Sequence, residues 1–313
     1  MRISGTWPRG IRMLGLLGVC LLVAYGITAG SYLLTPLGFA LIYAVFVAGL
    51  NLFMGYAGQV SFGQSAFAAI GGYGSAVLTT NYNWEPLAAL AVSAGGAGVL
   101  ALLIGAPTLR LRGHYLAMAT LAIGLMSYEL SVQWESLTQG YLGISGIPPF
   151  GVFGLQAQTD RQQFLVLVAA VALSLMSLRR LEQSRFGRAL KAVAGSEDAA
   201  AALGVNVMHA KLVAFVLSAL FASVSGSLLA HFVGYISPEM FGLHMVVLGF
   251  TMLYVGGIGT VTGPLIGAVV IAMLPELFRS LKDYQDLVYG IALVMILIHA
   301  PNGLAASLGG GRR

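Results

Sequence analysis

Long apolar runs follow one another along almost the whole chain. Each is about 20 residues long, which is the length that an α-helix needs to cross the hydrocarbon core of a bilayer. A soluble domain has no interior large enough for a chain of 313 residues that is 58% hydrophobic and 9% charged. We therefore predict an all-α, polytopic membrane protein in which residues 1–313 form a single transmembrane domain.

The apolar runs predict about ten transmembrane helices. Their expected positions are 12–30, 35–54, 60–80, 87–106, 114–130, 162–178, 212–233, 242–257, 264–280 and 286–300. The external segment 131–161 is rich in Gly and Pro, so it cannot form one helix. It separates two five-helix halves, 1–130 and 162–304. Because five is odd, the halves have opposite topology, as in many membrane transporters.

The distribution of cations orients these spans, because Lys and Arg collect on the cytoplasmic side of a membrane. The predicted topology leaves Arg161, Arg279 and Lys282 outside and the other 13 of the 16 Lys and Arg residues inside. The opposite orientation would reverse that ratio. We therefore predict that both termini are cytoplasmic.

The longest cytoplasmic connection is predicted at residues 179–211. Ser184 is placed to cap a helix that ends near Gly195, and Ser196 to cap a second helix with Glu197 in its first turn. The second helix contains four consecutive alanines and ends at Leu203-Gly204, so another protein could approach its backbone closely. From composition alone, an ordinary solvated connector is the favoured interpretation.

The predicted third span, 60–80, is the weakest because glycines recur through it. Such a span is a candidate for a broken or re-entrant helix. The densest set of polar residues within the membrane lies in and before it, and two interpretations stay open: close helix packing, or part of a translocation pathway. The candidates for the pathway are Asn51, Gly58, Gln59, Ser61, Gly63 and Gln64.

Enzymatic chemistry has no support in the sequence. The five histidines are scattered without metal-ligand spacing, and Cys20 is the only cysteine. The only lysines, Lys191, Lys211 and Lys282, do not follow glycine, so the phosphate-binding G-x-x-x-x-G-K-[ST] loop is absent. We expect no metal, no cofactor and no nucleic acid on this chain. If ATP drives it, a separate subunit must hydrolyse the ATP.

Five ordered segments together resemble a known family. The segments are Asn51–Ala76, Leu109–Gly124, Ser184–Ala219, Gly256–Ala268 and Leu274–Leu297. They are similar to the permeases of branched-chain amino acid ABC transporters, of the LivM type, and the similarity extends over residues 35–304.

The resemblance implies a subunit of an ATP-driven importer in the bacterial inner membrane. A second homologous permease would complete the translocation pathway, two cytoplasmic ATPase subunits would bind and hydrolyse ATP, and an extracytoplasmic binding protein would deliver the substrate. In the family, the matching part of the loop is the ATPase-coupling loop. The residues so implied are Glu197, Ala199, Ala200, Ala201, Leu203 and Gly204.

Two alternatives stay open. Urea and short-chain amide permeases resemble the same pattern, and residues such as His114 and Gln64 differ from those that relatives often have. A secondary transporter coupled to an ion gradient would suit two inverted halves. The absence of an acidic residue well inside any predicted span argues against a secondary transporter.

Overall fold

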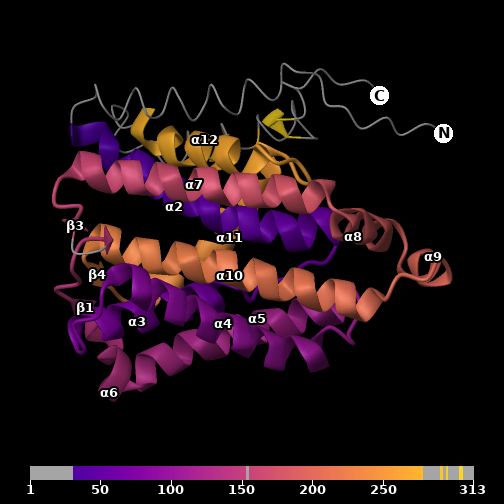
Figure 1. Cartoon of the computed structure of the whole chain (residues 1–313), viewed down its shortest axis with the longest axis horizontal. Coiled ribbons are helices and arrows are strands. Elements are labelled where there is room, and N and C mark those ends of the chain that lie inside the picture. The colour runs from indigo at the N-terminus through magenta and orange to yellow at the C-terminus, as the bar shows by residue number, and fades with distance from the viewer. Residues whose placement is uncertain (1–30, 153–154, 278–289, 292–293, 295–302, 306–313) are drawn as a thin grey trace.

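The computed structural model describes residues 31–152, 155–277, 290–291, 294 and 303–305, which form a helical bundle (Figure 1). Its α-helices are α2 (Ser31–Leu50), α3 (Gln64–Thr80), α4 (Pro86–Thr108), α5 (His114–Gln133), α6 (Glu135–Thr138), α7 (Asp160–Gln183), α8 (Arg185–Gly195), α9 (Glu197–Ala202), α10 (Val207–Val233), α11 (Leu243–Gly256) and α12 (Gly263–Leu277). The prediction of an all-α membrane protein is confirmed.

Among the residues that the structure describes, six helical segments are long and apolar enough to cross a membrane. They are α4, α5, α7, α10, α2 with the π-helical turn η1 (Asn51–Tyr56), and α11 with the 3-10 turn η3 (Pro238–Phe241). Each coincides with a predicted span. Helix α12 is shorter and lies at the predicted span 264–280. The predicted spans 12–30 and most of 286–300 lie outside the described residues, so the ten-helix count and the paired halves stay predictions.

The predicted third span is broken at its start. Residues 57–63 are irregular, and helix α3 begins at Gln64, four residues after the expected start. Gly58 has φ +67°, a conformation that side chains disfavour. Glycine therefore permits the chain to turn here between η1 and α3.

The connections between helices gather at two opposite ends of the bundle (Figure 1). At one end, Glu197 of α9 contacts Gln59 and Arg112, which belong to two other connections. At the other end, strand β1 (Ile144–Ser145) pairs in antiparallel orientation with strand β4 (Tyr235–Ile236). Segments predicted on one side of the membrane therefore lie together in the structure.

The predicted external segment 131–161 contains only short elements. After α6 come the 3-10 turn η2 (Gly140–Leu142), β1, and the hairpin of β2 (Gly151–Val152) with β3 (Leu155–Gln156). Besides the β1–β4 pairing, the Tyr235 hydroxyl donates to the Leu142 carbonyl at 3.1 Å. The segment is thus attached to the chain that follows α10.

Helices α2, α3 and α10 form the centre of the bundle. Small residues let α3 and α10 approach closely: a Cβ atom on Gly71 would overlap the backbone of Ser223, and one on Gly226 would overlap the carbonyl of Ala68. Helix α5 lies at the periphery, since only 11% of its apolar stretch is buried, against 61% for α10.

Candidate functional site

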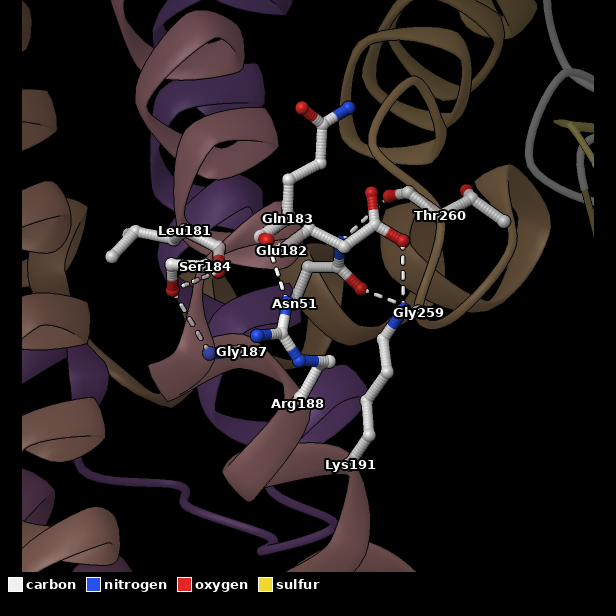
Figure 2. Close-up of polar contacts among 10 residues, drawn as sticks. All are labelled: Asn51, Leu181, Glu182, Gln183, Ser184, Gly187, Arg188, Lys191, Gly259 and Thr260. Atoms are coloured by element: carbon white, nitrogen blue, oxygen red, sulfur yellow. Dashed lines mark hydrogen bonds and ion pairs between the residues drawn. The ribbon is translucent and has the colours of Figure 1, made fainter. Parts of the chain in front are cut away.

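The two short helices predicted in the loop 179–211 are present. The Ser184 hydroxyl accepts a hydrogen bond from the Gly187 N–H at 3.0 Å and caps α8 (Figure 2). The Ser196 hydroxyl accepts from the Ala199 N–H at 3.3 Å and caps α9. These bonds satisfy N–H groups that every helix start leaves without an intrahelical acceptor.

The corner between α7 and α8 is held by side chains on both sides. The Lys191 ammonium donates to the Glu182 carboxylate at 2.8 Å, and the Arg188 guanidinium donates to the Gln183 carbonyl at 3.1 Å (Figure 2). The Lys191 Nζ atom also lies 5.5 Å from the centre of the Tyr56 ring. The position of α8 is therefore fixed relative to α7 and to η1.

Helix α9 presents an apolar surface at the end of this loop. Ala200 is buried, whereas Ala199 and Ala201 are exposed and Leu203 is 83% exposed. Gly204 has φ +84°, and a Cβ atom added to it would have no other heavy atom within 4 Å, so this residue ends the helix without adding bulk. The exposed face can accept the surface of another protein at short distance.

Glu197 is the residue that attaches α9 to the bundle. Its carboxylate forms an ion pair with Lys211 of α10, accepts a hydrogen bond from the Gln59 amide at 3.1 Å, and lies 3.7 Å from the Arg112 guanidinium. The Lys211 side chain is only 3% exposed. One carboxylate thus connects the projecting helix to α10, to the α4–α5 connection and to the irregular segment 57–63.

The glycine-rich segment packs directly on α8. A Cβ atom on Gly58 would lie 3.0 Å from the Ala194 Cα, so glycine is needed here for contact as well as for backbone conformation. Gln59 follows, with the hydrogen bond to Glu197. Two of the pathway candidates, Gly58 and Gln59, therefore meet the loop 179–211 at one end of the bundle.

Asn51, the first residue of η1, binds the glycine-containing turn between α11 and α12 (Figure 2). Its amide oxygen accepts from the Gly259 N–H and its amide nitrogen donates to the Thr260 carbonyl, each at 2.7 Å. The side chain is fully buried. Asn51 thus satisfies backbone groups of the turn between α11 and α12, which is a structural role.

Ser61, Gly63 and Gln64 lie deeper, beside α5. The Phe62 N–H donates to the Thr120 hydroxyl at 3.1 Å, and a Cβ atom on Gly63 would lie 2.7 Å from the Thr120 carbonyl oxygen. Ser61 and Gln64 are buried, and within the described part of the chain their side-chain polar atoms have no hydrogen-bond partner.

Sequence reasoning missed three polar residues. Lys211 was expected among the cations of the loop, but it belongs to helix α10 and is buried. Its position at the start of an apolar run was the sequence feature that could have indicated this. Thr120 and His231 carry no such signal. The Pro148 carbonyl can only accept, so the His231 Nδ1–H donates to it at 2.8 Å. In the uncharged ring the other nitrogen, Nε2, then accepts from the Ser75 hydroxyl at 2.8 Å.

The described residues contain no group of three or more His, Cys, Asp or Glu side chains that could hold a metal ion. A helical membrane bundle with a broken central helix, buried polar groups beside the break and short helices projecting from one end is typical of membrane transport proteins.

Comparison with known proteins gives the family. The sequence profile described as "Branched-chain amino acid transport system / permease component" matches residues 32–299, and the chain belongs to this family. The LivM permease of Salmonella typhimurium is 35% identical over 84% of this chain and 68% of its own length, and that of Escherichia coli is 34% identical over the same shares. Escherichia coli LivH is 27% identical over 89% of this chain and 92% of its length. No solved structure matches.

The contacts of Glu197 predict a large effect of removing its charge. Glu197→Gln leaves the Lys211 ammonium buried without a counter-charge, which costs about 3–5 kcal/mol. We expect a marked fall in the melting temperature of the purified chain and partial recovery in the double variant Glu197→Gln, Lys211→Met.

Asp198→Asn is the matched control, because the Asp198 side chain is 87% exposed and lies 3.7 Å from Arg112. Its effect on the free energy of unfolding should stay within about 0.5 kcal/mol. Equal melting temperatures for Glu197→Gln and Asp198→Asn would contradict the role given to Glu197.

Proposed function

We propose that this chain is the permease subunit of an ATP-driven importer of branched-chain amino acids and forms the translocation pathway with a second, homologous permease. The observation that carries the proposal is the similarity to the LivM permeases over 84% of the chain. The additional similarity to LivH, also described as a branched-chain amino acid permease, supports a pair of related permeases.

The proposal assigns ATP hydrolysis to partner subunits. The chain has no phosphate-binding loop of its own, so ATP would bind only to two cytoplasmic ATPase subunits. An extracytoplasmic binding protein would deliver the substrate at the opposite end. The exposed face of α9, with Ala199, Ala201 and Leu203, is the contact proposed for an ATPase.

The experiment that tests this function is uptake by the complex isolated through a tag on this chain. We expect proteoliposomes that contain the complex, its binding protein and ATP to accumulate labelled leucine and not labelled urea. Uptake of urea without leucine would favour the amide-permease alternative. Leucine uptake that continues without ATP and requires an ion gradient would favour a secondary transporter.

The proposed topology has ten spans in two inverted halves, with α8, α9 and both termini in the cytoplasm of a bacterium. Leu203 and Leu142 offer a matched test, because both side chains are 83% exposed and they lie at opposite ends of the bundle. In a Cys20→Ser background expressed without the ATPase subunits, which would cover Leu203, an impermeant maleimide should label Leu142→Cys in intact cells, and Leu203→Cys only after lysis. The reverse labelling would invert the topology.

The proposed docking face predicts that Ala201→Glu disrupts assembly. The new carboxylate would lose water at the interface without gaining a partner. We expect the permease to remain folded and inserted while the ATPase content of the purified complex falls about tenfold, which corresponds to about 1.4 kcal/mol.

Gln183→Glu adds the same charge at an exposed position just before α8 and should leave ATPase content unchanged. If Ala201→Glu complexes keep their full ATPase content and substrate-stimulated hydrolysis, α9 is only a connector.

A further inference from the structure

Helix α3 begins inside the bundle, away from both of its ends. The segment before it contacts Thr120 and Gly124, the seventh and eleventh of the 20 residues of α5. On another side, the Phe62 ring packs on the ring of Phe250, the eighth residue of the 14-residue helix α11, with centroids 4.8 Å apart. Two independent helices therefore place the start of α3 within the membrane, nearer the end of the bundle that carries α8 and α9.

The start of α3 has no side-chain cap in the described structure. Gly63 occupies the cap position and carries no side chain that could accept from the first N–H groups. A helix start also carries a partial positive charge of about half an elementary charge. In hydrocarbon, such groups are costly unless a polar partner satisfies them.

A second, independent observation points to a ligand. Gln64 is the first residue of α3 and is 1% exposed, and both its amide oxygen and nitrogen lack a hydrogen-bond partner among the described residues. The Cα–Cβ bond of a helical residue tilts toward the helix start, so this side chain is directed to the uncapped end. Ser61, 2% exposed, has an unpartnered hydroxyl three residues earlier. Unpaired buried amides are rare because each loses its hydrogen bonds to water without replacement.

We propose that the start of α3, with Ser61 and Gln64, is a transient binding site for the carboxylate of the transported amino acid. The backbone N–H groups, the Ser61 hydroxyl and the Gln64 amide nitrogen are donors, and the helix dipole favours an anion. The Gln64 amide oxygen remains as an acceptor for the ammonium group of the same molecule. This inference rests on the proposed function and adds the chemistry by which the pathway selects its substrate.

The proposed site distinguishes a carboxylate from a neutral amide. Urea and amides gain hydrogen bonds at such a site but no attraction from the dipole, and an isolated cation is repelled by it. In this structure α5 covers the site through the Phe62–Thr120 contact. Because little of α5 is buried, its displacement exposes the site at a smaller cost than separation of α3 from α10.

The direct test is protection of a cysteine from labelling. In a Cys20→Ser background, Ser61→Cys in the isolated complex with ATP is treated with a small methanethiosulfonate reagent. L-Leucine and 4-methylpentanoate, which both carry the carboxylate, should slow the modification about tenfold, equivalent to about 1.4 kcal/mol. L-Leucinamide and urea should not slow it.

Ser93→Cys is the control, because Ser93 is another buried hydroxyl without a described partner, on α4. Its modification should be insensitive to all four compounds. Protection of Ser61→Cys by leucinamide or urea as strong as that by leucine would overturn the proposal, as would absence of protection by the carboxylates. Failure of the proposed function appears separately, as absence of leucine uptake by the unmodified complex.

A second variant keeps the proposal falsifiable if Ser61→Cys does not assemble. Gln64→Glu places a negative charge where the carboxylate binds and should raise the KM for leucine uptake at least about tenfold. Gln133→Glu makes the same change at the exposed end of α5 and should leave the KM unchanged. Equal KM values for Gln64→Glu and the unmodified complex would also overturn the proposal.

Discussion

Hydrocarbon offers no hydrogen-bond partner to a backbone N–H or C=O group, so any interruption of a membrane helix must be satisfied by the protein itself. The turn between α11 and α12 meets this requirement through Asn51, whose amide donates to one backbone group and accepts from another. The break before α3 meets it only in part. The Phe62 N–H is paired with Thr120, but the start of α3 has no side-chain cap and the side chains of Gln64 and Ser61 have no described partners. The same constraint therefore identifies one interruption as structural and the other as the place where a polar ligand would be stabilised.

This break and the projecting helix α9 are far apart in the sequence but are bridged by one carboxylate. Gln59, five residues before Gln64, donates to Glu197, and Glu197 is paired with the buried Lys211. A buried ion pair adds little net stability, but separating its members is costly. Moving α9 away from Gln59 and α10 would therefore require separation of a buried ion pair. The exposed Arg112 contributes much less, since solvent screens its charge.

Local interactions were predictable from the sequence, and interactions between distant segments were not. Ser184 and Ser196 cap their helices as predicted, because a cap depends on residues within three positions of it. The Asn51–Gly259 bond joins residues 208 positions apart, and composition gave no reason to pair them. Lys211 was counted correctly among the cations of one end, yet its burial depends on Glu197 lying opposite it. The glycines marked the break before α3, but its place four residues beyond the expected start depends on contacts with α5 and α8.

The two ends of the bundle are closed by different kinds of interaction. At the end with β1 and β4, His231 joins α10 to Ser75 of α3 through a buried hydrogen bond and to the Pro148 carbonyl through a partly buried one, both between uncharged groups. At the other end, the contacts around Glu197 are ionic, and one of its partners, Arg112, is exposed. Charges at a partly exposed contact can exchange partners with an approaching protein, whereas buried neutral hydrogen bonds cannot exchange without opening the core. The structure thus places one exchangeable contact, that of Arg112, beside the buried Glu197–Lys211 pair at the α9 end, and neutral hydrogen bonds at the opposite end, with the uncapped start of α3 between them.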